Sequence, residues 1–365
     1  MYLSELKIWN FRKFGEGEKK SPIGEEKNPG IHLRLNSGLN LLVGENDSGK
    51  TAIIDAIKMV LFTQSYEYYR LEDEDFHIHP DLSEEERAKE LRIECIFRGF
   101  QPSEAKNFLE WIGIESDSEG TPNYYLRVFL IGRRENGRIY RDLKAGSDEQ
   151  GTSLDGKARD LLRIVYLRPL RDAEFELSPR RNSRLSQIFQ EHEAFKNNSD
   201  HVLLKIYEEF NDAIKHYFDG EDKDGNILSS DQKGKNLKLG LDNSIKGFFT
   251  INSEVEVNTT KAELKKILES LELTLTDIKN PGLGSLNRLF MASELIHLNK
   301  DNWTGLKLGL IEEIEAHLHP QVQLKVIEYM QQFEDTQLIV TTHSPNLASK
   351  VHLDKIIICR NKGVY

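Results

Sequence analysis

The chain has 365 residues, of which 38% are apolar and 30% are charged, and its 49 Lys and Arg stand against 60 Asp and Glu. This composition excludes global disorder, and a chain of this length is large enough for two lobes or for one large α/β domain with an insertion. The apolar runs fall well short of the ~18–20 residues of a membrane span, and the two cysteines, Cys95 and Cys359, exclude a disulfide framework and favour a reducing cytoplasm.

In the first half, alternating or continuous apolar residues predict strands over 2–12, 31–35, 39–43, 91–98, 124–131 and 138–143. Residues 15–30 are rich in charge, Gly and Pro and predict a loop. A helix over 51–62 carries apolar residues on several sides, as is typical of a helix buried against a sheet. The pair Asn136-Gly137 predicts a tight hairpin turn between two of the strands.

The second half begins with an Arg-rich segment, 159–196, and continues with a polar segment over 197–250 that contains an amphipathic helix over 202–217. Beyond it the apolar pattern predicts helices and strands in alternation. The expected helices are 261–270, 285–298 and 320–333, and the expected strands are 271–277, 306–311, 337–341 and 355–359.

One segment carries a complete phosphate-binding motif, G-x-x-x-x-G-K-[ST]. Its residues are Gly44, Glu45, Asn46, Asp47, Ser48, Gly49, Lys50 and Thr51. The glycines let successive backbone N–H groups converge on phosphate oxygens, and the helix that follows adds its positive dipole end. We expect Lys50 to reach the β- and γ-phosphates and the Thr51 hydroxyl to bind Mg²⁺. The alternative is a Gly-rich turn that matches by chance, which the flanking apolar strand and helix disfavour.

Two acids, Glu312 and Glu313, follow the apolar strand that ends at Ile311. The first can hold Mg²⁺ and the second can polarise an attacking water, because adjacent residues on a strand point in opposite directions. The alternative is a solvated acidic run at the start of a helix. His343 follows another apolar strand, where it can contact a γ-phosphate, although a lone histidine is often structural.

Three segments, GENDSGKT, LIEEIEAHLHP and IVTTHSP, together resemble the ABC-class ATPase head of the OLD (overcoming lysogenization defect) family, related to RecF and SMC heads. Residues 165–174 and the opening Asn10-Phe11-Arg12 resemble that family more weakly. The resemblance implies an α/β ABC-type ATPase head, a P-loop NTPase of mixed sheets flanked by helices, with ATP and Mg²⁺ as cofactors. The expected domains are an amino-terminal lobe over 1–175, a helical insertion that serves dimerisation over 176–250, and a carboxy-terminal lobe over 251–365.

The resemblance also assigns roles to single residues. It implies that Glu312 is the Walker B metal ligand, Glu313 the catalytic base and His343 the switch histidine, and that Arg12 approaches the nucleotide. An LSGGQ signature is absent, and the turn that contains Gly284 and Ser285 stands in its place, where it would meet a γ-phosphate held by another subunit. Ile314 replaces the usual proline after the acids.

For function, the resemblance implies ATP-dependent homodimerisation or higher self-association that regulates a DNA nuclease, in anti-phage defence. Because the sequence shows no Toprim acid cluster, we expect the Toprim nuclease module or partner protein to be supplied outside these residues. DNA is an expected partner, and the candidate phosphate contacts are arginines 133, 134, 138, 141, 159, 163, 168, 171, 180, 181 and 184, which could equally pair with nearby acids. A RecF- or SMC-like DNA clamp without nuclease activity, a non-hydrolysing nucleotide sensor and a transporter ATPase remain as alternatives.

Overall fold

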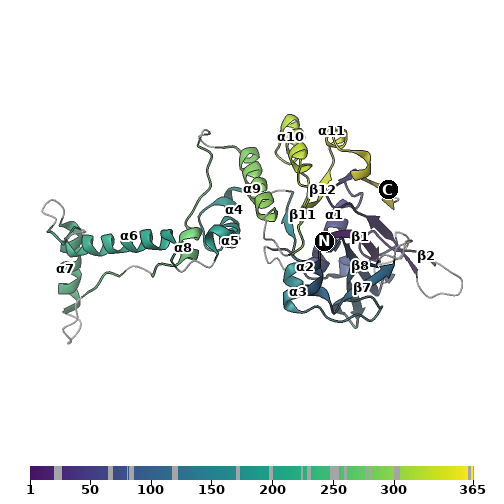
Figure 1. The fold of residues 1–365 in the computed structure, drawn as a ribbon, viewed down its shortest axis with the longest axis horizontal. Coiled ribbons are helices and arrows are strands. Elements are labelled where there is room, and N and C mark those ends of the chain that lie inside the picture. Colours follow the sequence, from purple (N-terminus) through teal and green to yellow (C-terminus); the bar gives the residue numbers. More distant parts are fainter. Residues whose placement is uncertain are drawn as a thin grey trace. The chain divides into compact units, whose positions relative to one another are not determined.

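The chain forms two compact units, Met1–Ala173 with Asn280–Tyr365, and Glu174–Lys279. The insertion expected over 176–250 lies within the second unit, which continues to Lys279. The computed structural model (Figure 1) describes residues 1–19, 27–64, 69–79, 81, 86–116, 122–169, 173–196, 200–222, 225–227, 232–246, 255–258, 261–276, 278, 281–299, 305–360 and 363–364.

An antiparallel sheet forms one layer of the first unit, in the order β4-β1-β6-β8-β7, with β9 also paired to β8. Its strands are β1 (Tyr2–Trp9), β4 (Ile31–Arg34), β6 (Glu90–Arg98), β7 (Ile112–Ser116), β8 (Pro122–Glu135) and β9 (Arg138–Ala145). Asn136 and Gly137 link β8 to β9 with φ angles of 51° and 71°. Both angles are positive, which matches a two-residue hairpin turn, so the predicted turn is confirmed.

The second sheet of this unit has the order β10-β11-β12-β5-β13-β14. Its strands are β5 (Leu39–Val43), β10 (Val165–Leu167), β11 (Leu308–Ile311), β12 (Gln337–Thr342), β13 (Ile356–Arg360) and β14 (Gly363–Val364). The strands from β10 to β13 pair in parallel, with Ile311 opposite Val340 and Thr342 opposite Val43. The carboxyl ends of β5, β11 and β12 therefore meet at one edge of the sheet, where ligands of open α/β sheets bind.

Helix α1 (Lys50–Leu61) belongs to a hydrophobic core that both sheets share. Ile53, Ile54 and Ile57 of α1 are at most 1% exposed and join core residues such as Ile93 of β6 and Leu310 of β11. Burial of most of its residues explains why α1 has apolar residues on several sides, as its sequence predicted. Full burial of side chains of this kind stabilises the fold by about 1.5–3 kcal/mol each.

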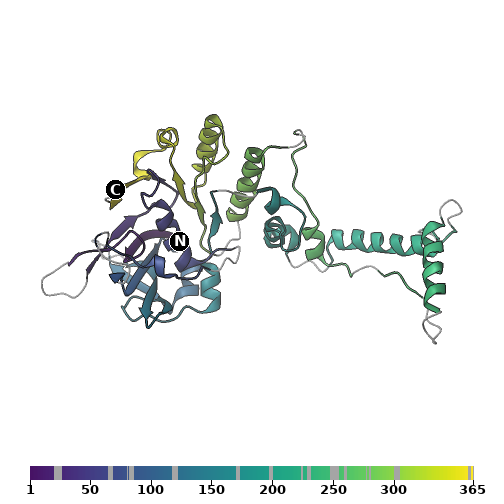
Figure 2. The same cartoon turned by 180° about the vertical axis from the view of Figure 1, so that it is seen from behind.

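Further helices and strands complete the first unit (Figures 1 and 2). They are the helices α2 (Pro102–Ala105), α3 (Gly156–Leu161), α9 (Leu283–Leu298), α10 (Pro320–Met330) and α11 (Pro345–Ala348) and the paired strands β2 (Glu16–Lys19) and β3 (Lys27–Pro29). The loop expected over 15–30 was therefore wrong for β2 and β3, whose pairing a local reading of charge and Gly content does not reveal. No helix among the described residues combines the length and apolar character needed to cross a bilayer.

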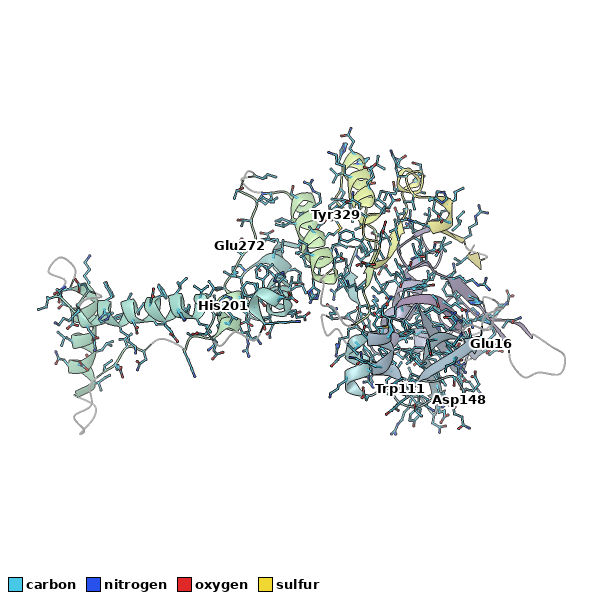
Figure 3. The ribbon with its side chains drawn as sticks, viewed as in Figure 1. Glu16, Trp111, Asp148, His201, Glu272 and Tyr329 are labelled. Carbon is cyan, nitrogen blue, oxygen red and sulfur yellow. The ribbon has the colours of Figure 1, made fainter. Side chains whose placement is uncertain are left out.

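The second unit contains α4 (Ala173–Leu177), α5 (Arg184–Glu191), α6 (Val202–Asp219), α7 (Lys233–Lys246) and α8 (Leu264–Glu269). Leu185 of α5 and Leu268 of α8 are fully buried where these two helices pack together. His201, labelled in Figure 3, precedes α6 and accepts a hydrogen bond from the backbone N–H of Leu203 at 3.1 Å. The strand expected over 271–277 was wrong: residues 271–276 form no strand, because alternation alone supplies no hydrogen-bonding partner, and residue 277 lies outside the described residues.

Candidate nucleotide-binding site

A tight loop joins β5 to α1 and contains the predicted phosphate-binding motif. A Cβ atom at Gly44 would lie 2.3 Å from the carbonyl oxygen of Cys359 and 2.7 Å from Oγ of Ser48, so only glycine fits at this position. Gly49 has a φ of 102°, in the left-handed region that favours glycine, and immediately precedes the first helical residue. The loop thus presents the amino terminus of α1 at the sheet edge where β5, β11 and β12 end.

Lys50 is 5% exposed and its ammonium group lies within the loop. Nζ donates to the carbonyl oxygens of Gly44 and Glu45, each at 2.7 Å, and lies 3.3 Å from Nδ1 of His343. Burial lowers the pKa of Lys50, while neighbouring groups, Glu315 among them, act in the opposite direction. A cation held at the start of a helix and ringed by backbone groups is suited to an anionic ligand.

The two acids that follow β11 lie in different environments. Glu312 is 3% exposed, hydrogen-bonds the Thr51 side chain, and accepts a hydrogen bond from the Tyr166 hydroxyl at 2.7 Å. Burial raises the pKa of Glu312, and these hydrogen bonds oppose that effect. Glu313 has a φ of 45°, and its side chain is 44% exposed. Both acids lie beyond the end of β11, so this left-handed turn, rather than strand alternation, separates their side chains.

Ile314, where a proline was the usual residue, is fully buried. Its backbone N–H donates to the carbonyl oxygen of Thr341 at 3.3 Å, and the N–H of Glu313 donates to Oγ1 of Thr341 at 2.9 Å. Proline has no backbone N–H, so a proline at this position could not make the first of these bonds. The turn that carries the acids is therefore anchored to β12 by two consecutive backbone donors.

His343 stands at the end of β12 between Lys50 and Glu313. Its Nε2 lies 3.8 Å from Oε1 of Glu313, and its backbone N–H donates to Oε1 of Glu315 at 2.5 Å. Glu315 was not singled out from the sequence, where it is one acid in a run of three. Its position in the fold shows that it holds the backbone of His343.

A cavity of about 590 Å³ brings most of the predicted site residues together. Arg12, Asn46, Asp47, Ser48, Gly49, Lys50, Thr51, Glu313 and His343 line it. Gly44 and Glu45 contribute their carbonyl oxygens to Lys50, and Glu312 reaches the site through Thr51. Arg12 has a φ of 50°, and its guanidinium group is held by Asp55 at 2.5 Å and by Asp75 at 2.9 Å.

Gly284 and Ser285 do not line this cavity. They line a separate one of about 230 Å³ together with His317 and His319. A Cβ atom at Gly284 would lie 2.5 Å from the carbonyl oxygen of His317, so glycine permits α9 to approach the turn after the two acids. A role for Gly284 and Ser285 in contacting nucleotide held by another subunit stays a prediction.

The residues present fit a magnesium ion and a triphosphate. The Thr51 hydroxyl and the Glu312 carboxylate are in hydrogen-bond contact, and both are the oxygen ligands that Mg²⁺ prefers. The loop supplies backbone donors and the Lys50 cation for phosphate oxygens. Sequence patterns pointed to these residues but gave no sign of Asp55 and Lys58, and they gave Tyr166 no role within the segment 165–174. The ion pairs of Asp55 with Arg12 and Lys58, and the bond from Tyr166 to Glu312, arise only in the fold.

Several of the arginines proposed for DNA have acidic partners. The ion pairs are Arg133 with Glu90 and Asp142, Arg134 with Asp73, Arg163 with Asp160, and Arg180 with Glu176. Arg141 donates to the backbone oxygens of Met59 and Tyr69, and Arg171 lies outside the described residues. For these paired arginines, the structure favours the alternative in which they neutralise nearby acids.

Known proteins that are similar to this chain include an endonuclease and a probable ATPase. A family model described as "AAA domain, putative AbiEii toxin, Type IV TA system" matches residues 39–349. "Endonuclease GajA" of Bacillus cereus (strain HuB5-5) is 23% identical over 96% of this chain and 59% of its own length. "Retron Vc95 probable ATPase" of Vibrio cholerae serotype O1 biovar El Tor is 23% identical over 98% of this chain and 73% of its own length. The chain thus spans less than two thirds of the length of the endonuclease.

Among solved structures, an SMC head bound to the C-winged helix domain of ScpA is 18% identical, with a TM-score of 0.50 over 100% of this chain and 96% of that one. At this identity the likeness shows the fold alone, a head of the ABC type. The OLD-type resemblance that the three motifs indicated is confirmed by these matches. The chain belongs to the AAA-domain family described as putative AbiEii toxin, type IV TA system, and has the fold of an ABC-type ATPase head.

Proposed function

We propose that this protein binds and hydrolyses ATP with Mg²⁺ in the cavity between the β5–α1 loop, Glu313 and His343. The observation that carries the proposal is the meeting of Lys50, Glu313 and His343 in one cavity, although about 260 residues separate the first from the second in the sequence. A P-loop lysine that binds phosphates and an acid or other polar group that positions the attacking water are parts that P-loop NTPases use for phosphoryl transfer.

In the proposed reaction, the loop N–H groups and Lys50 bind the phosphates. Thr51 and Glu312 would hold Mg²⁺, which would neutralise charge on the phosphate oxygens. Glu313, the more exposed of the two acids, accepts a proton from the water that attacks the γ-phosphate. His343, 3.8 Å from Glu313, orients that water or contacts the γ-phosphate. Arg12 lines the same cavity, where Asp55 and Asp75 hold its guanidinium group.

We further propose that ATP binding drives self-association and regulates a DNA nuclease supplied by a Toprim module or a partner protein, in anti-phage defence. The likeness to an endonuclease of which this chain covers 59% supports an ATPase part that works with a nuclease part. In this proposal a second copy contacts the cavity that Gly284, Ser285, His317 and His319 line.

The central experiment measures ATP turnover and ATP affinity for the wild type, Glu313→Gln and Lys50→Ala. Loss of a general base slows turnover by about 100-fold or more, so Glu313→Gln should lose hydrolysis but keep ATP affinity. Lys50→Ala should lose affinity itself, measured by calorimetry. A wild type that binds ATP yet releases no phosphate, at high protein concentration and with DNA present, would instead be a nucleotide sensor.

The fold of an SMC head favours a second candidate, a DNA clamp without nuclease activity. The two candidate functions are distinguished by measuring DNA cleavage and ATP-dependent DNA retention with the protein and its natural partner. Retention of circular but not linear DNA, without cleavage, is expected only of a clamp.

A further inference from the structure

A connected set of buried and half-buried polar side chains runs along one side of α1 and ends at Glu312. At one end, the Tyr166 hydroxyl donates to Oε1 of Glu312 at 2.7 Å. Nζ of Lys58 lies over the face of the Tyr166 ring, 3.8 Å from its centroid, and 4.6 Å from the centroid of the Tyr69 ring. Lys58 is 3% exposed, so this is a buried cation held against two aromatic faces.

Asp55 anchors this cation. Its Oδ1 lies 2.5 Å from Nζ of Lys58, and its Oδ2 lies 2.5 Å from Nη1 of Arg12. Asp55 and Lys58 stand one and two turns beyond Thr51 on α1, so the same helix carries the Thr51 hydroxyl and the support for Tyr166. The chain of contacts therefore joins Arg12, which lines the nucleotide cavity, to Glu312, which reaches the cavity through Thr51, by way of Asp55, Lys58 and Tyr166.

We propose that Tyr166 and Lys58 are positioning residues for Glu312. The Tyr166 hydroxyl holds one carboxylate oxygen of Glu312, and the Lys58 ammonium group holds the Tyr166 ring by packing against its face. Neither side chain lines the cavity, so neither is expected to touch nucleotide. Outer groups that orient a metal-binding carboxylate set the affinity of the metal, and their loss weakens it by about 10–100-fold. This inference rests on the proposed magnesium-dependent ATPase function.

The test measures Mn²⁺ affinity by electron paramagnetic resonance, using the full chain with a saturating non-hydrolysable ATP analogue, and separately measures analogue affinity in EDTA. Tyr166→Phe, which removes only the hydroxyl, should weaken Mn²⁺ binding about 10-fold or more and leave the metal-free affinity within about twofold. Tyr69→Phe is the matched control: it also removes a phenol hydroxyl and keeps a ring over Lys58, and its Mn²⁺ affinity should equal that of the wild type.

Lys58→Met keeps an unbranched side chain of similar length and removes the cation, and Arg12 still pairs with Asp55. It should weaken Mn²⁺ binding less than Tyr166→Phe does. The double variant should be no weaker than Tyr166→Phe alone, because Lys58 acts through that tyrosine and the effects of coupled residues do not add.

Wild-type Mn²⁺ affinity in Tyr166→Phe would overturn the inference, and so would an equal loss of metal-free and metal-dependent affinity, which indicates a merely structural role. Additive losses in the double variant would overturn the part assigned to Lys58. Failure of the proposed function gives a different result, in which the wild type itself binds no nucleotide.

Discussion

Oε1 of Glu315 accepts a hydrogen bond from the backbone N–H of His343 at 2.5 Å, across 28 residues of sequence. This bond ties the turn that follows β11 to the end of β12, and it fixes where the His343 ring enters the cavity. The other carboxylate oxygen of Glu315, Oε2, is buried and has no hydrogen-bond partner. A buried carboxylate oxygen without a partner is costly, so we expect the position of Glu315 to serve the site rather than stability.

Glu315 gives the first prediction. Glu315→Ala removes the acceptor for His343, so ATP turnover should fall about 10-fold or more while ATP affinity changes little, since such losses follow small misplacements of catalytic groups. Glu315→Gln keeps an acceptor oxygen and should retain much of the activity. Steady-state phosphate release measures both. Equal activity in the wild type and Glu315→Ala would show that the bond to His343 has no part in turnover.

A second prediction concerns Gly44. Gly44→Ala places a Cβ atom 2.3 Å from the Cys359 carbonyl oxygen, so the loop must shift. We expect ATP affinity to fall at least about 10-fold, because a displaced loop no longer directs its N–H groups at the phosphates. Gly38→Ala is the control, since its Cβ atom meets no atom within 4 Å. Calorimetric titration with ATP compares them, and equal affinities would contradict the tight fit of this loop.

A third prediction separates backbone strain from crowding. Gly137 has a φ of 71°, and a Cβ atom there meets nothing within 4 Å. Gly137→Ala should lower the free energy of unfolding by about 1–2 kcal/mol through the left-handed backbone alone. Gly156→Ala, at the start of α3, meets no atom and has no such φ, so it should be neutral or slightly stabilising. Urea unfolding curves measure the free energy of unfolding of both variants. Equal losses in both would contradict the assignment of the loss to the left-handed backbone of Gly137.

A fourth prediction follows from the buried thiols. Burial raises the pKa of Cys359 from 9.0 to about 11, and that of Cys95 further. At pH 8 the native Cys359 thiolate is about 100-fold scarcer than in an unfolded chain, so alkylation should be slower by at least that factor. Because the folded-state pKa is raised, the stability from the neutral thiol is present below pH 9 and is lost as the pH rises towards 11.

The measurement for this fourth prediction is iodoacetamide labelling followed by mass spectrometry, native and in urea. Cys359→Ala removes one titrating group and should flatten the fall in stability between pH 9 and pH 11. Fast native labelling at Cys359 would show that the thiol is accessible and that burial does not set its pKa.

The difference between what was predicted and what was found is clearest at the two acids. The apolar strand before Glu312 and the motif that ends in Thr51 were recognisable, because each is a local pattern of residue types. Their different environments were also expected, but the reason given, alternation along a strand, was wrong because β11 ends at Ile311, before both acids. The left-handed φ of Glu313 depends on Thr341, which holds the N–H groups of Glu313 and Ile314 from another strand.

The sequence by itself determined the phosphate loop, the strand-end acids, the hairpin turn at Asn136-Gly137 and the buried character of α1, because spacing and residue type specify each of these over a few neighbouring residues. Only the tertiary structure decided that β5, β11 and β12 end at one edge, that Glu315 holds His343, and that Tyr166 reaches Glu312. These contacts join residues far apart in the chain, and their partners follow from parallel strand register and core packing.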